Sequence, residues 1–478
     1  MTDGTTHISP TQNDGPARAG RLGPLAYLVM LGLGVAIFLA IRSLGETLEA
    51  PHVTALPARA AVSKGEVDVV FHVLATLSAV IAVGYLIGRA FRWLGQPPVI
   101  GEVIAGLVLG PSVLGALSPQ IAHLLVPAPD IDPSGTVTGA LRAISQLGVV
   151  LYMFLVGLEL NGPRMRKQAQ AAVAISHASI LLPFLLGAGL SLWLYPLLSS
   201  AEVSFTSFAL FMGVAMAITA FPVLARILTD KKLDKTELGS LALGCAATGD
   251  VTAWCLLALV IGVAQAQVGN AVQVLLATIA FIAVMFTVVG PIATRVARRL
   301  DQGEFPSWTI PGVLVAVMVS ALATETIGIH SVFGGFLLGA VIPHDSRLAG
   351  ELHRKLHDVA TILLLPAFFA VTGLQTEISL LGQGGDWLAV GAIILVATVG
   401  KVGGTFAAAR FTGMDWRSAS ALGMLMNTRG LMELIVLNIG LEMGIISPTL
   451  FAMMVLMALA TTLSTAPALR WLIPEARA

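Results

Sequence analysis

The sequence predicts an all-α membrane protein that crosses the bilayer about fourteen times. Of its 478 residues, 56% are hydrophobic and only 11% are charged, and the mean hydropathy is +0.87. Soluble domains carry about a quarter charged residues, so the composition excludes an ordinary soluble enzyme. The 27 basic and 27 acidic side chains cancel, and without a basic excess we expect no nucleic-acid partner.

A helix needs about 20 mostly apolar residues to cross the hydrocarbon core, and fourteen segments meet or approach that length. An extra N-terminal helix is predicted over 24–42, after a polar segment, residues 1–23, that we expect to be disordered. The short, glycine-rich span over 330–343 is the weakest of the set. The other spans are predicted over 68–92, 97–117, 140–160, 169–198, 206–229, 237–263, 270–294, 308–328, 356–376, 387–411, 416–441 and 447–472.

Loop charges give the orientation, because cytoplasmic loops carry an excess of Lys and Arg. Arg18 and Arg21 place the N-terminus inside, and every second loop after them is basic; only Arg59 and Lys64, after the first span, break the pattern. We therefore expect a multi-pass protein of the inner or plasma membrane with both termini cytoplasmic. The inner loops hold Arg89 and Arg92; Arg164, Arg166 and Lys167; Lys231, Lys232 and Lys235; Arg295, Arg298 and Arg299; Arg347, Arg354 and Lys355; Arg410 and Arg417; and Arg470 and Arg477.

An internal repeat relates the two halves of the chain. Residues 103–110 resemble residues 332–339, and residues 154–159 resemble residues 369–375 with one insertion. The matched spans are seven apart. Because this offset is odd, the two halves insert with opposite orientation, as in many secondary transporters. The alternative is that the glycine-rich segments resemble each other by chance. The predicted organisation is a first repeat over 68–263, a connector helix over 270–300 and a second repeat over 308–472.

Two predicted spans are interrupted at corresponding positions of the repeats. One contains Ala217–Ile–Thr–Ala–Phe–Pro222, where proline removes a backbone donor. The other contains Met426–Asn–Thr–Arg–Gly430. Each interruption alone is compatible with a packing kink. Together they predict two broken helices that present free carbonyls and helix ends to one place, where a cation could bind.

Few charged residues fall inside the spans. Asp250 lies in the middle of one span, where a carboxylate costs about 2.5–3.5 kcal/mol and is rarely without a function. Lys401 lies in the middle of another, and a buried Asp–Lys pair that only holds the halves together is the structural alternative. Arg429 and Glu433 are four residues apart on one helix face, which predicts a pair that organises the second break.

No pattern indicates an enzyme, a transition-metal site or a bound cofactor. Cys245 and Cys255 are ten residues apart on one span, about 15 Å along a helix, too far for a disulfide. His353 and His357 have the i, i+4 spacing of zinc ligands. They lie in a basic inner loop, where solvated side chains or a response to pH are the simpler interpretations.

The motifs in residues 96–112, 154–160, 250–254 and 427–434 resemble the monovalent cation/proton antiporter superfamily, in the branch of bacterial potassium/sodium–proton antiporters and plant cation/proton exchangers. The resemblance implies the sodium/proton antiporter fold, a homodimer, and a core of crossed broken helices that moves as an elevator. It also implies that Asp250 is the ion- and proton-binding carboxylate, that the hydroxyl of Thr219 lines the first crossing, and that Lys401 is the core lysine. The implied supporting residues in the breaks are Pro222, Asn427, Thr428, Arg429 and Glu433.

The chain departs from this family at Gly249, where electrogenic members carry a second acid and other members an amide. With one carboxylate we predict electroneutral exchange of one Na⁺ or K⁺ for one proton, and Lys401 loses its usual first partner. We expect no C-terminal nucleotide-binding domain, so gating of that kind would need a regulatory subunit. The alternatives are a gated, channel-like cation efflux protein and a membrane sensor that does not transport.

Overall fold

A computed structural model describes most of the chain and contains only helices, turns and loops in the part described. The predictions of disorder over residues 1–23 and of the basic loop at 164–167 fall outside that part. The described residues are 24–48, 68–128, 131–159, 169–233, 236–264, 268–303, 305–382 and 384–473.

Every predicted span coincides with a helix or a pair of helices. Ten helical segments among the described residues are long and apolar enough to cross a membrane. The four other predicted spans fall on shorter helices, so the total of fourteen stays a prediction. The helices are α1 (Pro24–Gly45), α2 (Val69–Trp93), α3 (Pro98–Leu109), α4 (Pro119–Leu125), α5 (Thr136–Leu158), α7 (Ala169–Leu198), α8 (Phe205–Ala217), α9 (Phe221–Asp230), α10 (Glu237–Ala264), α11 (Val268–Val284), α12 (Gly290–Gln302), α13 (Thr309–Ile327), α14 (Ser331–Val341), α15 (Arg347–Asp358), α16 (Leu365–Gln375), α17 (Gly384–Phe411), α18 (Trp416–Met426), α19 (Leu431–Glu442) and α20 (Pro448–Leu472).

Two segments that the sequence assigns to loops are helical, whereas α12 falls almost wholly within the predicted connector helix. The helix α4 lies in a predicted outer loop, and α15 carries most of a predicted inner loop. In α15 the apolar side chains of Leu348, Ala349 and Leu352 are buried on one face while the basic residues face outward. An amphipathic helix of this kind is too polar to be recognised as a span.

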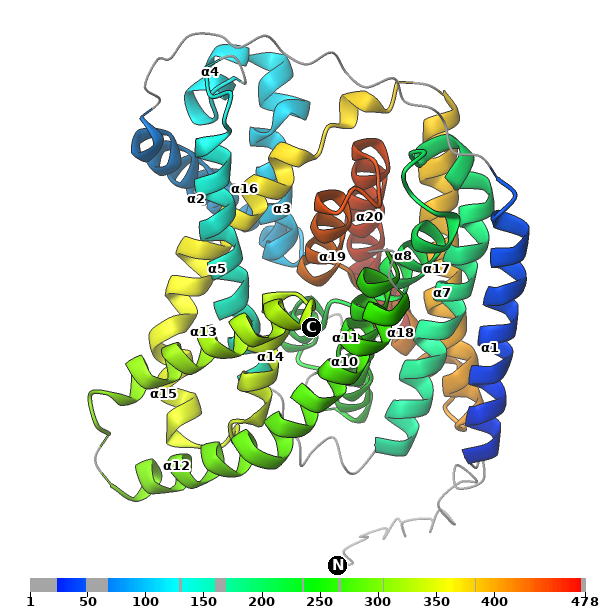
Figure 1. Ribbon diagram of the computed structural model, residues 1–478. Helices are drawn as coiled ribbons and strands as arrows, with labels where there is room; N and C mark the ends of the chain where they lie inside the picture. Colours follow the sequence, from blue (N-terminus) through cyan, green and yellow to red (C-terminus); the bar gives the residue numbers. More distant parts are fainter. Residues whose placement is uncertain are drawn as a thin grey trace, which may run out of the picture.

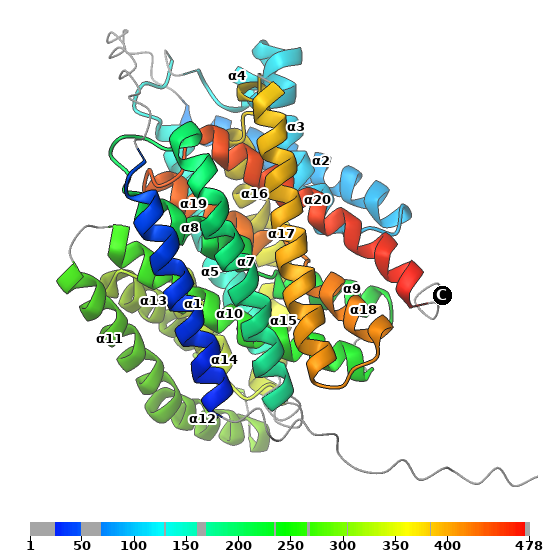
Figure 2. The ribbon, with the colours of Figure 1, turned by 90° about the vertical axis from the view of Figure 1, so that its right-hand side faces the viewer.

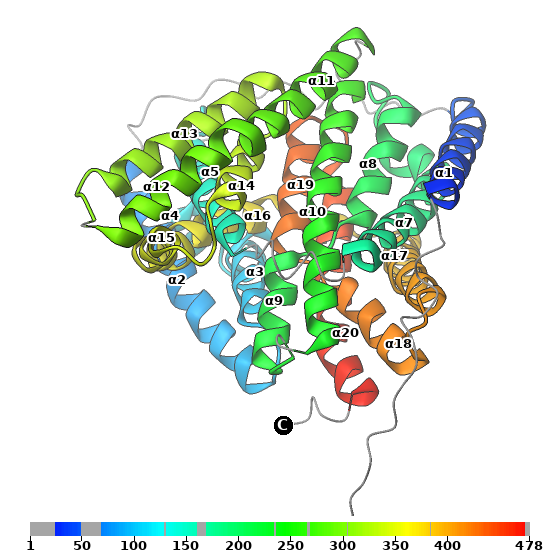
Figure 3. The ribbon, with the colours of Figure 1, turned by 90° about the horizontal axis from the view of Figure 1, so that it is seen from below.

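The helices form two groups, which lie side by side in Figure 1. The flanking body consists of α2, α3, α5, α13, α14, α15 and α16. The crossing body consists of α7, α8, α9, α10, α17, α18, α19 and α20. The helices α11 and α12 connect the two groups in the chain, and the close backbone contacts across the boundary include those of α20 with α3 and with the turn at Ile378–Leu380. Figure 3, seen from below, shows the same division.

Two glycine crossings hold the flanking body together. A Cβ atom on Gly106 of α3 would lie 2.1 Å from the carbonyl oxygen of Phe369 in α16. A Cβ on Gly157 of α5 would lie 2.2 Å from the carbonyl oxygen of Phe336 in α14. Only glycine permits such close approach of two backbones. Each crossing joins a helix of one predicted repeat to a helix of the other, which is the packing that an inverted repeat would produce; the repeat boundaries stay a prediction.

The helix α1 lies at the edge of the molecule, against α7 and α8 of the crossing body (Figure 2). Its outward face carries exposed Leu28, Val29, Leu33 and Leu44. Because most of the surface of these apolar side chains is exposed, hydrocarbon is the medium that suits this face.

Candidate ion-binding site at a helix crossing

The first interruption separates α8 from α9. Residues 218–220 are extended, and α9 begins with Pro222 in its first turn. Proline is favoured there because the first turn of a helix needs no internal donor and its fixed φ suits a helix start. The proline therefore begins a new helix and leaves the last carbonyls of α8 without helical partners.

The second interruption separates α18 from α19 over residues 427–430. Gly430 precedes α19, and a Cβ atom on it would lie 2.8 Å from Cγ2 of Val223 in α9. A larger residue at position 430 would push the two broken helices apart. The glycine of the sequence motif thus allows the second break to approach the first.

Two hydrogen bonds join the breaks directly. The hydroxyl of Thr219 donates to the carbonyl oxygen of Met426 at 2.9 Å. The backbone N–H of Ala220 donates to the carbonyl oxygen of Thr428, also at 2.9 Å. The two interrupted segments, more than 200 residues apart in the chain, therefore cross in contact with each other.

Two cationic side chains cap the C-terminal end of α8. The guanidinium of Arg429 donates to the carbonyl oxygens of Ala215 at 2.8 Å and Met216 at 2.6 Å. The ammonium of Lys401 donates to the carbonyl oxygen of Ala217. Positive charge is favourable at this end of a helix, where the dipole is negative. Lys401 thus contacts a backbone carbonyl, and the two carboxylate oxygens of Asp250 have no hydrogen-bond partner among the residues that the structure describes.

Arg429 is further fixed by Glu433 and Thr462. Its guanidinium forms an ion pair of 2.7 Å with Glu433, both side chains being fully buried, as the spacing on one helix face predicts. The hydroxyl of Thr462 in α20 accepts from the backbone N–H of Arg429 at 2.8 Å and donates to its carbonyl oxygen at 2.7 Å. Sequence reasoning missed Thr462, because an uncharged residue in an apolar helix gives no signal of a partner 33 residues away.

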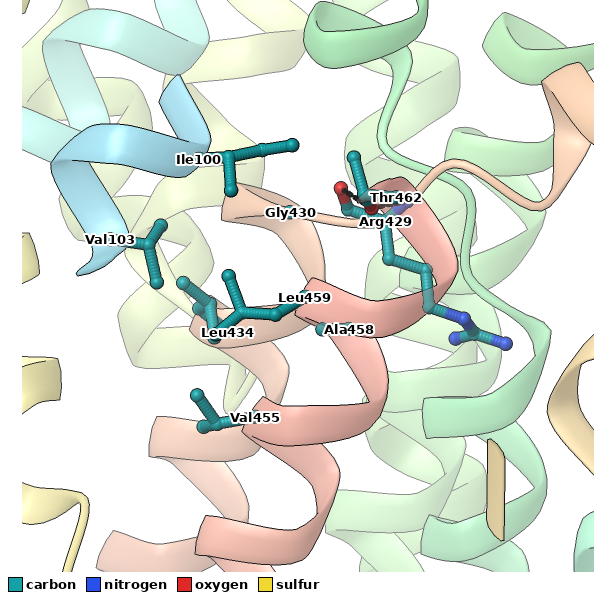
Figure 4. A pocket seen from close by; sticks show the side chains of 9 residues that line it. All are labelled: Ile100, Val103, Arg429, Gly430, Leu434, Val455, Ala458, Leu459 and Thr462. Atoms are coloured by element: carbon teal, nitrogen blue, oxygen red, sulfur yellow. Dashed lines mark hydrogen bonds between the residues drawn. The ribbon is translucent and has the colours of Figure 1, made fainter. Parts of the chain in front are cut away.

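Figure 4 shows this corner of the crossing, where α19 and α20 face α3 of the flanking body. A space of about 10 Å³ separates Ile100 and Val103 of α3 from Gly430 and Leu434 of α19. This is about the volume that one water occupies. The side chain of Arg429 points away from that space, toward α8, so the boundary between the two bodies is apolar here.

Asp250 lies in the middle of α10, which packs against α8, α9 and α18, the helices whose ends meet at the crossing. Its side chain is 1% exposed. An ionised carboxylate that is buried without hydrogen bonds is costly, so it calls for a bound proton or a bound cation. The neighbouring Gly249 faces α7, where a Cβ atom would lie 3.2 Å from the hydroxyl of Ser176.

Other buried polar atoms at the crossing also have no partner. Among the described residues they include the amide nitrogen and oxygen of Asn427 and the hydroxyl of Thr428, both in fully buried side chains. Buried polar groups are nearly always hydrogen-bonded, so this group of neutral oxygens suits a ligand such as a desolvated cation. Asn438, farther along α19, likewise has a side-chain oxygen with no partner among the described residues; as a single uncharged residue in an unbroken apolar helix, it gave no signal in the sequence.

The histidines of α15 lie apart from this site. His353 contacts Glu159 at 3.2 Å, and the rings of His353 and His357 are stacked with centroids 4.8 Å apart. Among the described residues, no three His, Cys, Asp or Glu side chains gather closely enough to hold a metal ion.

Discontinuous helices that cross beside a buried carboxylate are the architecture of a secondary transporter built from inverted repeats. Residues 77–471 match the family model for the transmembrane sodium/hydrogen exchanger. The chain belongs to the sodium/hydrogen exchanger family.

Curated relatives carry related names. The chain is 44% identical over 398 residues to the Na⁺/H⁺ antiporter NhaS4 of Synechocystis, covering 83% of this chain and 95% of the relative. It is 39% identical to cation/H⁺ antiporter 18 of Arabidopsis thaliana over 83% of this chain and 48% of the relative. It is 33% identical to K⁺/H⁺ antiporter 1 of Saccharomyces cerevisiae over 83% of this chain and 46% of the relative. The chain thus spans about half the length of the plant and yeast relatives.

A solved structure shares the fold. The sodium proton antiporter MjNhaP1 of Methanocaldococcus jannaschii superposes with a TM-score of 0.62, covering 85% of this chain and 98% of that one at 15% sequence identity. At this identity the likeness concerns the fold alone, and it agrees with the sodium/proton antiporter fold that the sequence predicts.

Proposed function

We propose that the chain exchanges a monovalent cation, Na⁺ or K⁺, for a proton across a membrane, and that Asp250 binds either one. The observation that carries the proposal is the buried carboxylate of Asp250, without a hydrogen-bond partner, on the helix that packs against both breaks. The names of relatives in bacteria, plants and yeast, which are all cation/proton antiporters, support it.

Competition for one site couples the two fluxes. A proton or a desolvated cation each neutralises Asp250, whereas an empty, ionised carboxylate opposes burial. The unpartnered oxygens of Asn427 and Thr428 would serve as neutral ligands for the cation. The site can then cross the membrane loaded with either species but not empty, which is the requirement for exchange.

The exchange is electroneutral in this proposal. Gly249 supplies no second carboxylate, and Arg429 is already neutralised by Glu433 at 2.7 Å. The hydrogen bond from Lys401 to Ala217 supports a role for this lysine as a fixed helix cap. One carboxylate then carries one cation in one direction and one proton in the other.

The surroundings of the transporter are part of the proposal. The apolar helices fit a lipid bilayer, and we assign the protein to the inner or plasma membrane, with both termini cytoplasmic and a homodimer as the working assembly. No bound cofactor is required, because the cation and the proton are the transported species. A regulatory subunit would have to be found by experiment.

The test is proton flux in proteoliposomes after addition of Na⁺, K⁺ or Li⁺. We expect cation-dependent flux from the wild type and none from Asp250→Asn. The matched control is Asp345→Asn, the same change at an 85%-exposed side chain, which should exchange normally. Retained flux in Asp250→Asn would refute the proposal. Flux without a counter-gradient would indicate a channel, and cation binding without flux a sensor; either would also refute it.

An imposed membrane potential tests the stoichiometry. Exchange of one cation for one proton moves no net charge, so the rate should not change when the potential is clamped at different values. A clear dependence of rate on voltage would contradict the electroneutral proposal while leaving exchange itself intact.

A further inference from the structure

A cavity of about 700 Å³ lies between α1 and the crossing body. It is several times larger than the ~150 Å³ apolar cavity that takes up benzene in another protein. One wall is a face of α1, and the other is made of α7, α8 and α10. Its apolar lining includes Leu31, Val35, Phe38, Leu181, Leu256 and Leu259.

This cavity is separate from the ion site. The family model begins at residue 77, after α1, so one wall of the cavity lies outside the residues that the model matches and the other wall lies within them. Thr252 of α10 lines the cavity, and Asp250, two residues earlier, is turned by about 200° around the helix. The two sites therefore use opposite faces of α10.

Polar groups gather at one end of the cavity. Arg42 and Glu46, in and just beyond the last turn of α1, form an ion pair of 2.6 Å, and each side chain is about half exposed. The hydroxyl of Thr206 contacts the same Glu46 oxygen at 3.5 Å. Cationic side chains at the end of a membrane helix extend to the headgroup region. The cavity is thus apolar along most of its length and charged at one end. This charged mouth, formed by Arg42 and Glu46, presents one positive and one negative group together.

We propose that this cavity binds one phospholipid, with an acyl chain between α1 and α10 and the headgroup at Arg42 and Glu46. The exposed apolar face of α1 borders the bilayer, so lipid is the ligand present at high concentration beside the cavity. A zwitterionic headgroup complements the mouth, because its phosphate would contact Arg42 and its ammonium Glu46. Phosphatidylethanolamine has this chemistry. The bound lipid fills the space between α1 and the crossing body. Because it binds only the folded protein, it raises the free energy of unfolding by mass action.

The test counts bound lipid by native mass spectrometry. Delipidated full-length protein is titrated with palmitoyl-oleoyl-phosphatidylethanolamine, and one lipid per chain is expected at saturation. The double variant Leu31→Trp, Leu39→Trp fills the cavity and should weaken binding about tenfold or more, which is 1.4 kcal/mol or more. The matched control is Leu33→Trp, Leu44→Trp, on the exposed face of the same helix, which should bind like the wild type.

Equal binding by the cavity and control variants would overturn the proposal. A second result would also overturn it: the wild type binds no lipid, and the cavity variants no longer form a dimer. In that case a second copy of the chain would be the occupant of the cavity. A photoactivatable acyl chain on the unmodified protein gives a second measurement that does not depend on the variants folding. It should label α1 and α10 peptides that carry Phe38 and Leu259; labelling only of the outer face of α1 would contradict the proposal. Both measurements report lipid binding and not ion exchange, so a failure of the lipid proposal can be told apart from a failure of the proposed exchange function.

Discussion

Asp250 and Glu433 are both fully buried acids of the crossing body, but their surroundings are opposite. Glu433 is neutralised by Arg429 at 2.7 Å, and Arg429 also holds two carbonyl oxygens of α8. The oxygens of Asp250 have no hydrogen-bond partner. A buried charge with a permanent partner is structural, whereas a buried acid without one needs a partner that comes and goes. The spacing of Arg429 and Glu433 on one helix face predicted this structural pair, and the position of Asp250 in the middle of a span predicted a functional acid.

Replacing Arg429 should destabilise the protein strongly. In Arg429→Met the carboxylate of Glu433 and two helix-end carbonyls lose their partner, and removal of one member of a buried ion pair costs about 3–5 kcal/mol. The matched control is Arg142→Met, which removes a half-exposed pair of 3.6 Å with Glu442 and should cost about 1 kcal/mol or less. Thermal unfolding in detergent measures both. Equal shifts in Tm for the two variants would contradict the structural role of Arg429.

The loop before α5 predicts a pH dependence. Burial raises the pKa of Asp132, but hydrogen bonds from Val137, Thr136 and Ser134 lower it more, so the pKa lies below its usual range. A depressed folded-state pKa contributes stability above the unfolded value of about 3.9 and loses it as the pH falls through the folded value. Asp132→Asn should therefore lower stability at neutral pH by about 1 kcal/mol, and the difference should vanish in acid. Thermal unfolding over a pH series measures this, with Asp345→Asn as a control; a difference that persists in acid would contradict it.

At the scale of helices, the sequence predicted both interruptions because Pro222 and Gly430 mark them chemically. It did not predict what closes them. The carbonyls of α8 are capped by Lys401 and Arg429, which lie 184 and more residues away in the chain, and no local pattern encodes such contacts. The helices α4 and α15 were missed for a different reason, because short or amphipathic helices resemble polar loops in a search for spans. The sequence also did not predict that Gly249 faces α7, because this depends on how the two helices pack.

The glycine crossings of the flanking body give a prediction for α3 and α5. Gly106→Ala or Gly157→Ala would place a Cβ about 2 Å from a backbone carbonyl oxygen that belongs to another helix. Backbone cannot yield as a side chain can, so we expect either variant to lose at least 1–3 kcal/mol of stability. Gly391→Ala in α17, which would meet nothing within 4 Å, should instead gain up to about 1 kcal/mol. Thermal unfolding of the three variants in one detergent measures these changes in stability. A Gly106→Ala variant as stable as the wild type would contradict the close backbone contact at this crossing.

For the whole molecule, the main feature is that few close backbone contacts join the two bodies. Polar contacts across the boundary include Arg142–Glu442 at 3.6 Å and Asn438–Thr372 at 3.1 Å. The boundary near α3 is apolar. A boundary of this kind allows one body to slide against the other, which is the motion that the family resemblance implies. Composition and loop charges could predict the membrane and the spans, but the grouping into two bodies depends on contacts that only the folded chain makes.

Cross-linking tests this motion. In a background of Cys245→Ala and Cys255→Ser, the pair Arg142→Cys, Glu442→Cys bridges the two bodies. Joining it with a short thiol-specific reagent should stop exchange. The pair Glu46→Cys, Thr206→Cys joins the residue after α1 to α8 on one side of the boundary, and joining it should leave exchange unchanged. Full exchange with the bodies linked would show that transport does not need their relative movement.

The central claim is that one carboxylate, Asp250, binds a proton or a cation but not both. Calorimetric titration of the purified protein with Na⁺ or K⁺, repeated in buffers of different ionisation enthalpy, measures the protons released per cation bound. At a pH where Asp250 is protonated before the cation is added, the account predicts release of one proton per cation by the wild type and no cation-linked release by Asp250→Asn. Cation binding without proton release, or equal release by Asp250→Asn, would contradict it.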